Sequence, residues 1–185
     1  MIIRSVVLFV HLVGMLVLFG GLGFEWLTLR ILRRSATQEQ ALPWVGVYAA
    51  LPRAMGIAVG LILISGIYLA ARADAYDSAW VRVSFGAMVF MAILGGPAVR
   101  SRTRAIRRAG GDDHDWNSAT LQRHASDPLL SASLFIRMAV GLAIIYLMIS
   151  KPSLTESLLL IGVTFALGAA MSLPQWRAQS STVGV

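Results

Sequence analysis

Five apolar stretches, each about 20 residues long or longer and poor in charge, constrain the fold of this chain more than any other feature. A helix needs about 20 apolar residues to cross the ~30 Å hydrocarbon core of a bilayer. Only 14% of the residues are charged and 57% are hydrophobic, whereas soluble domains are about 25% charged. The chain therefore has too little charge to cover a water-exposed surface. We predict an all-α, polytopic transmembrane helix bundle that forms one integral membrane domain over residues 1–185. The predicted spans are about 5–32, 54–71, 80–99, 129–150 and 154–173.

The second apolar stretch, residues 41–71, is too long for one straight crossing. Pro52 interrupts it, and proline is tolerated near a helix start but disfavoured within a helix. Trp44 and Tyr48 precede that proline, and both residue types favour the headgroup level of a membrane. We therefore expect an interfacial segment before the second span.

Capping signals predict where the last two spans begin. Asp127 followed by Pro128 is typical of an N-cap with proline at the first helical position. Ser153 and Glu156 match the capping box. The turn between these spans is so short that they must form an antiparallel hairpin. If the last apolar stretch only lies on the membrane, four spans remain.

Basic residues predict the orientation. Eleven of the sixteen lie on one side of the predicted membrane, four on the other, and Arg137 lies inside a span. By the positive-inside rule, the N-terminus is outside and the C-terminus inside a bacterial inner membrane. The net charge of +7 is thus explained by topology, and we exclude nucleic acid as a partner. The predicted cytoplasmic loop, residues 100–128, carries a basic cluster expected to contact anionic lipid headgroups: Arg100, Arg102, Arg104, Arg107 and Arg108.

Three ionisable residues stand out inside the predicted spans: His11, Glu25 and Arg137. Such groups are costly in lipid and mark candidate functional sites. His11 and Glu25 are within about 40° of one helix face and ~21 Å apart along its axis, and Gly14 and Gly21 share that face. Small groups there favour close helix packing. Glu25 and Arg137 have comparable depths, so we predict a buried ion pair that either sets helix register or serves a substrate or proton pathway.

His11 is the candidate with the most specific chemistry. A neutral imidazole can bind haem iron or copper, and Met15, one turn later, would complete a soft ligand set for Cu(I). Haem or porphyrin is the favoured cofactor and copper the second. In the competing interpretation, His11 only hydrogen-bonds to a group such as Tyr68 or Ser84. The absence of cysteine excludes disulfides, thiolate metal sites and covalently attached haem.

The first helix resembles the opening helix of a group of small bacterial membrane proteins. The similar residues are His11 to Gly14 and Phe19 to Phe24, with Gly20, Gly21 and Gly23 between aromatic residues. The group comprises copper-resistance D-like proteins, HemJ-type protoporphyrinogen oxidases and uncharacterised predicted integral membrane proteins. The resemblance implies that His11 contacts haem or porphyrin. The HemJ-type pattern also expects a lysine in a later span, but Lys151 lies in a turn, so the uncharacterised branch is the nearest.

Two classes of function follow. In the first, the chain has a redox or metal- or haem-linked role and uses His11 near the outer side. In the alternative, it is a non-catalytic transporter-like or partner-binding bundle in which Glu25–Arg137 is structural or gates a pathway. The bilayer is one partner in both, and Gly-rich helix faces could also contact a second copy of the chain or another membrane protein.

Overall fold

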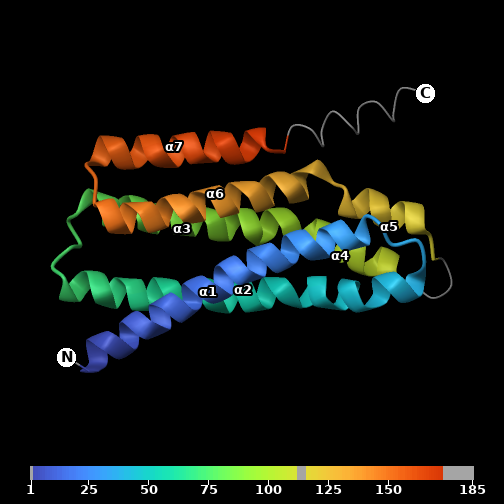
Figure 1. Cartoon of the computed structure of the whole chain (residues 1–185), viewed down its shortest axis with the longest axis horizontal. Helices are drawn as coiled ribbons and strands as arrows, with labels where there is room; N and C mark the ends of the chain where they lie inside the picture. Colours follow the sequence, from blue (N-terminus) through green and yellow to red (C-terminus); the bar gives the residue numbers. More distant parts are fainter. Residues whose placement is uncertain (1, 112–115, 173–185) are drawn as a thin grey trace.

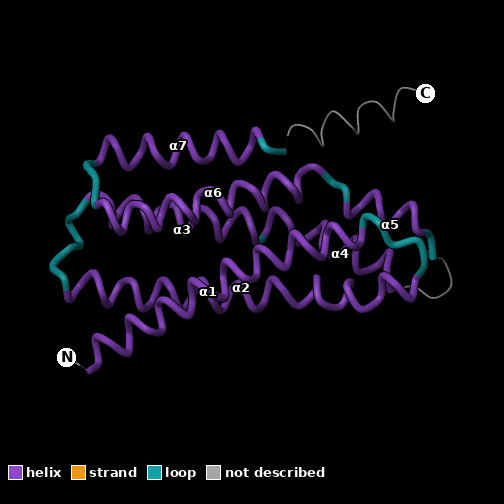
Figure 2. The backbone as a smooth tube through the Cα atoms, viewed as in Figure 1, coloured by secondary structure: helices purple, strands orange, loops and turns teal. Residues whose placement is uncertain are grey.

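The computed structural model describes residues 2–111 and 116–172, and these residues fold into helices joined by short connections (Figures 1 and 2). The side chains of residues 97–100 and 111 are not described. The predicted all-α membrane bundle is confirmed. The helices are α1 (Ile2–Leu32), α2 (Gln38–Arg72), α3 (Ala79–Gly95), α4 (Pro97–Gly111), α5 (Ser118–Ala125), α6 (Pro128–Ser150) and α7 (Leu154–Ala170).

Both predicted helix starts are confirmed. The Asp127 side chain accepts a hydrogen bond from the Leu129 amide at 2.8 Å, with Pro128 opening α6. Ser153 and Glu156 form a complete capping box at the start of α7. Lys151 adopts a left-handed backbone conformation (φ 49°), and this reverses the chain so that α6 and α7 run antiparallel (Figure 1).

The predicted break at Pro52 is wrong. α2 is one continuous helix of 35 residues that contains both Pro43 and Pro52. Each proline removes one backbone hydrogen bond, but Val45, Tyr48 and Met55 on either side of Pro52 are buried against other helices, so packing maintains the helix through the interruption. The segment that we expected at the interface is the first part of α2. At about 52 Å, α2 is longer than a bilayer core is thick.

Most of the segment predicted to form a cytoplasmic loop, residues 100–128, is helical and forms α4 and α5. Ile106 of α4 and Leu121 of α5 are fully buried and belong to a hydrophobic cluster with Leu29 of α1 and Val45 of α2. These contacts provide the apolar burial that a short basic helix needs in order to be stable.

The bundle therefore has two hydrophobic cores, one on each side of Glu25. The first core contains Leu18, Leu22, Met55, Met88 and Met91, among others. The second lies at the end of the molecule where α1 ends and α5 packs. We refer to this end as the α5 end, and to the opposite end as the N-terminal end.

α1 and α2 run antiparallel and in close contact, as the small-residue face of α1 predicts. A Cβ added at Gly14 would lie 2.9 Å from Ile62 Cγ1, and one at Gly21 would lie 3.1 Å from Met55 Cγ. Both distances are shorter than ordinary van der Waals contacts, so a larger residue at either position would force the facing side chain to shift, and glycine favours this close approach.

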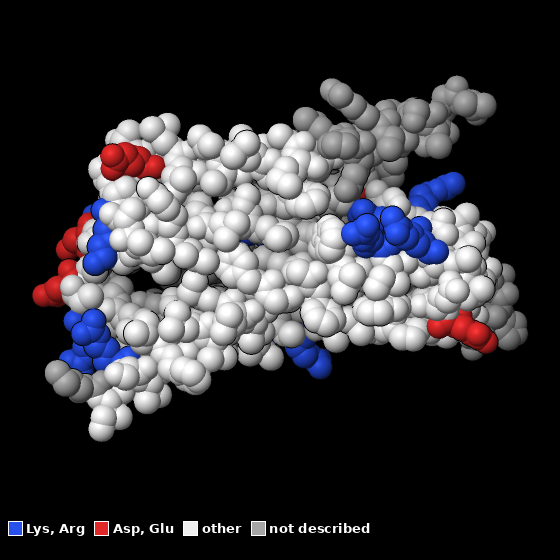
Figure 3. All heavy atoms as spheres, viewed as in Figure 1, with Lys and Arg blue, Asp and Glu red and all other residues white. Residues whose placement is uncertain are grey.

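Large apolar side chains remain exposed along the bundle, as expected for a surface that faces lipid rather than water; Leu16 and Ile64 are each more than 70% exposed. Charged side chains gather towards the two ends, and most of the surface between them is uncharged (Figure 3). Within the described residues, α1, α2 and the stretch Ser118–Ser150 are long and apolar enough to cross a membrane. α3 and α7 have 17 residues each, which corresponds to about 26 Å.

Candidate functional site

His11 is buried in α1, with 4% of its surface exposed. Its Nδ1 atom lies 2.9 Å from Ser65 Oγ on α2. The Cε1 atom of the ring packs on Gly66, where an added Cβ would lie 3.3 Å away. The Nδ1–Cε1 edge of the imidazole therefore faces α2.

The hydrogen bonds of Ser65 favour one tautomer of His11. The Ser65 hydroxyl donates to the backbone carbonyls of Leu61 and Ile62. A serine hydroxyl has one hydrogen. When that hydrogen points to these carbonyls, Ser65 Oγ accepts in its contact with His11, and Nδ1–H donates. In the neutral ring, Nε2 then keeps its lone pair.

The suggested partners Tyr68 and Ser84 are wrong, because Ser65 takes that role. Tyr68 instead lies beside Arg72, whose Cζ is 5.7 Å from the ring centroid. Ser84 Oγ is buried and has no hydrogen-bond partner.

A cavity of about 750 Å³ adjoins His11 at the N-terminal end of the bundle. Helices α1, α2, α3 and α6 all contribute to its wall, and the space-filling view shows an opening at this end (Figure 3). Ser84 lines the same cavity, together with mostly apolar neighbours such as Phe85 and Met88; Arg4 and Arg82 are its charged residues. This cavity was not predicted from the sequence. The small residues Ser65, Gly66 and Ser84 were the available signal.

Met15 does not join His11 at this cavity. It packs, partly buried, against the first hydrophobic core and is not among the residues that line the cavity. Among the described residues, no group of three or more His, Cys, Asp or Glu side chains is positioned to hold a metal ion.

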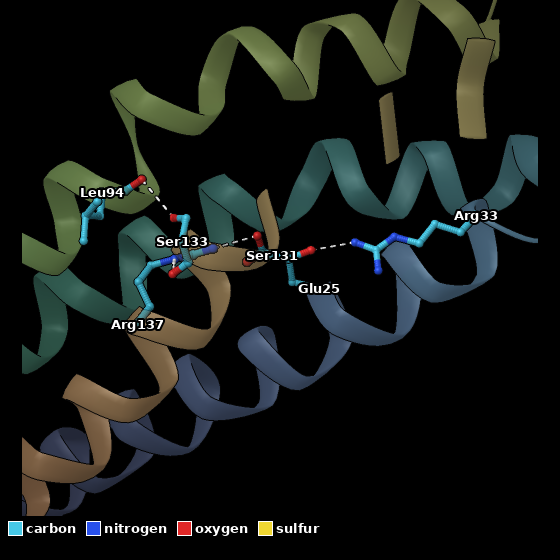
Figure 4. A network of polar contacts seen from close by, with 6 residues as sticks. All are labelled: Glu25, Arg33, Leu94, Ser131, Ser133 and Arg137. Carbon is cyan, nitrogen blue, oxygen red and sulfur yellow. Dashed lines mark hydrogen bonds and ion pairs between the residues drawn. The ribbon is translucent and has the colours of Figure 1, made fainter. Parts of the chain in front are cut away.

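Glu25 and Arg137 meet at the junction between the two cores. Arg137 Nη2 lies 2.7 Å from Glu25 Oε1, and the two side chains are only 7% and 6% exposed. Arg137 Nε also donates to the Ser133 carbonyl at 3.1 Å, and Ser133 Oγ donates to the Leu94 carbonyl (Figure 4). The ion pair thus connects α1 and α6, and the serine links both to the end of α3.

A second polar network lies about two turns further towards the α5 end (Figure 4). Arg33 donates through Nε to the Ala125 carbonyl at 2.8 Å and through Nη2 to Ser131 Oγ at 2.7 Å. This network joins the end of α1 to α5 and α6. The sequence analysis counted Arg33 only as a topology marker.

The ion pair borders a second cavity, of about 460 Å³. Arg104 and Arg107 of α4 line it, as do Leu22 and Met55. The other three arginines of the predicted headgroup cluster are not among the residues that line this cavity. Arg102 pairs with Asp127 at 3.0 Å, Arg108 is exposed, and the side chain of Arg100 lies outside the described part.

The comparisons with known proteins support a membrane assignment. The family described as "Predicted integral membrane protein (DUF2269)" matches residues 5–152, which include α2 to α6 and nearly all of α1. Neither the curated proteins nor the solved structures contain a significant match to the chain. This family corresponds to the uncharacterised branch of the group that the first helix resembles; the copper-resistance D-like and HemJ-type branches are not among the matches. Because the match extends over most of the chain, the protein belongs to this family of integral membrane proteins.

Proposed function

We propose that this membrane protein binds haem or a related porphyrin in the cavity at the N-terminal end and uses it in a redox role. The observation that carries the proposal is that His11 lines a large cavity while its Nδ1 atom is in hydrogen-bond contact with Ser65. With Nδ1–H as the donor, the Nε2 lone pair is available to a ligand. Histidines that bind metals usually donate their other ring N–H to a protein oxygen, which orients the ring. Nδ1–H and Ser65 Oγ have this arrangement.

The cavity itself suits such a ligand. Small-molecule sites usually measure about 300–1,000 Å³ and have an apolar wall with few polar groups, and a volume of about 750 Å³ falls in this range. Arg4 and Arg82 line the cavity and could pair with carboxylates on a porphyrin. Ser84 Oγ offers one further polar contact. Bound haem would supply one-electron chemistry, while the protein would supply the axial imidazole and the apolar surroundings.

Optical absorption of protein purified from haem-replete cells tests this proposal. We expect a Soret band that His11→Ala abolishes and that His124→Ala, on α5, leaves unchanged. Ser65→Ala should weaken haem retention, because it releases Nδ1 and the tautomer is no longer held. A wild-type protein that stays colourless after haem-replete expression, and that binds no haemin on titration, would refute the proposal.

A second candidate, transport, rests on the relation of the two cavities. Both are lined by α2 and α3 but at different heights, with Met88 on the wall of one and Met91 on the wall of the other. Both methionines belong to the first hydrophobic core, which separates the cavities. The chain has no cysteine, so single-cysteine variants at Met88 and Met91 can be labelled from either side of proteoliposomes. Labelling of one position from both sides would favour a pathway, whereas strict one-sided labelling would contradict it.

A further inference from the structure

The second cavity combines a buried cation with unused hydrogen-bonding capacity. A guanidinium carries five N–H groups, and the structure engages two groups of Arg137, Nη2 with Glu25 and Nε with the Ser133 carbonyl. The Nη1 group packs beside Gly95, where an added Cβ would lie 3.1 Å from it. Glycine at this position leaves room around Nη1, and Arg137 forms part of the cavity wall.

The charges around this cavity favour an anion. Arg104, Arg107 and Arg137 line it and oppose a single carboxylate, that of Glu25, so the ionised groups sum to +2. Arg104 and Arg107 are three residues apart on α4 and therefore share one face of that helix. Both are exposed, whereas Arg137 is buried, so positive charge extends from the surface to the cavity interior.

The rest of the wall is apolar and belongs to the membrane-embedded core. Leu18, Leu22, Met55, Val59 and Met91 line the cavity away from α4, and they also pack in or against the first hydrophobic core. A soluble anion would leave this apolar surface unused. An amphiphile would use both parts of the cavity.

The charged part of the cavity lies at the level expected for a bilayer surface. Trp26 follows Glu25 on α1, and the Arg30 guanidinium stacks 5.2 Å from its ring centroid. On α2, Pro52 lines the cavity and is followed by the exposed Arg53. Tryptophan and arginine concentrate where a helix leaves the hydrocarbon core, and basic pockets at that level bind lipid headgroups.

We propose that this cavity binds an anionic amphiphile. Its phosphate or carboxylate lies between Arg104, Arg107 and Arg137, and its apolar chain lies along Leu22 and Met55. The ligand would stabilise α4 against α1 and α2. The site is separate from the His11 cavity, so this inference does not depend on haem binding.

Thermal unfolding of the purified, delipidated protein in a neutral detergent tests the proposal. Added dioleoylphosphatidylglycerol should raise the Tm saturably, and dioleoylphosphatidylcholine should not. The Arg104→Gln/Arg107→Gln variant should weaken the apparent Kd about 25-fold, because each basic group near an anionic lipid contributes about fivefold. The matched control is Arg53→Gln/Arg108→Gln, which removes two exposed arginines outside the cavity and should keep the wild-type Kd.

Two further variants test the site without removing a surface arginine. Glu25→Gln should tighten phosphatidylglycerol binding, because it removes the one carboxylate found among the described residues of the cavity wall. Gly56→Leu should weaken binding by filling the cavity. An added Cβ meets nothing within 4 Å at Gly56 or at Gly60, and Gly60→Leu, outside the cavity, should bind normally.

Separate arms with oleate and with inorganic phosphate identify the source of the anion. Stabilisation by oleate that Arg104→Gln/Arg107→Gln removes supports an amphiphile with a carboxylate. Stabilisation by inorganic phosphate alone as strong as by phosphatidylglycerol would overturn the proposal, because the apolar wall would then be irrelevant. Equal losses in the two double-arginine variants would also overturn it, since they would indicate diffuse attraction by the whole basic surface.

Discussion

Replacing Glu25 by glutamine leaves Arg137 as an uncompensated buried charge. At an effective dielectric constant of about 20, two unit charges at the observed N–O distance of 2.7 Å attract each other by about 6 kcal/mol. Removing the two ions from water costs several kcal/mol each and offsets most of this gain, but breaking such a pair from one side costs about 3–5 kcal/mol. We therefore expect Glu25→Gln to lower the free energy of unfolding by about 3–5 kcal/mol.

Arg137→Gln should have a cost of similar size, since it also loses the bond from Nε to the Ser133 carbonyl. The double variant Glu25→Gln/Arg137→Gln carries no charge at this site, and its two amides can hydrogen-bond to each other. We expect it to recover about 2 kcal/mol or more relative to the sum of the single variants.

The assay is reversible unfolding of lipid-free protein by SDS in mixed micelles, followed by circular dichroism of the helices. Arg102→Gln is the control. Arg102 pairs with Asp127 at 3.0 Å, but the two side chains are 36% and 27% exposed, and such pairs contribute about 1 kcal/mol or less. Additivity of Glu25→Gln and Arg137→Gln within about 0.5 kcal/mol would show that the two residues are not energetically coupled.

Two smaller perturbations test the packing and capping of α7 by the same unfolding measurement. An added Cβ at Gly168 would lie 2.7 Å from Ile136 Cα, so Gly168→Ala should force α6 and α7 apart and lower the free energy of unfolding by about 1–3 kcal/mol. The control is Gly162→Ala, where an added Cβ meets nothing within 4 Å, and this change should be neutral or stabilising. Equal effects of the two changes would contradict this packing. Ser153→Ala removes the N-cap of α7 and should lower the free energy of unfolding by about 1 kcal/mol. Ser153→Asp should retain most of the stability, because aspartate also caps helices. A loss as large with aspartate as with alanine would show that the cap is not the cause.

The membrane assignment, the helix starts and the close-packing face of α1 were all predictable, because each depends on residues near one another in the chain. Hydropathy over about 20 residues indicates a span, and the Asp127 and Ser153 caps involve atoms within three residues. Gly14 and Gly21 share a helix face through the 3.6-residue period alone. The comparable depths of Glu25 and Arg137 also follow from counting residues into each span, and the structure places the two side chains in contact.

Other features depend on which helices contact each other and on how each helix is rotated about its own axis. Patterns of nearby residues in the sequence do not indicate either. Which of Ser65, Tyr68 and Ser84 faces His11 depends on the rotation of α2 and of α3 about their axes, and the contact is made by Ser65. α2 continues through Pro52 because buried neighbours stabilise it. Each of the two cavities is bounded by four or more helices, so neither can be read from one segment. The sequence by itself thus determined which stretches form apolar helices, whereas only the packing of those helices decided which cavities His11 and Arg137 line.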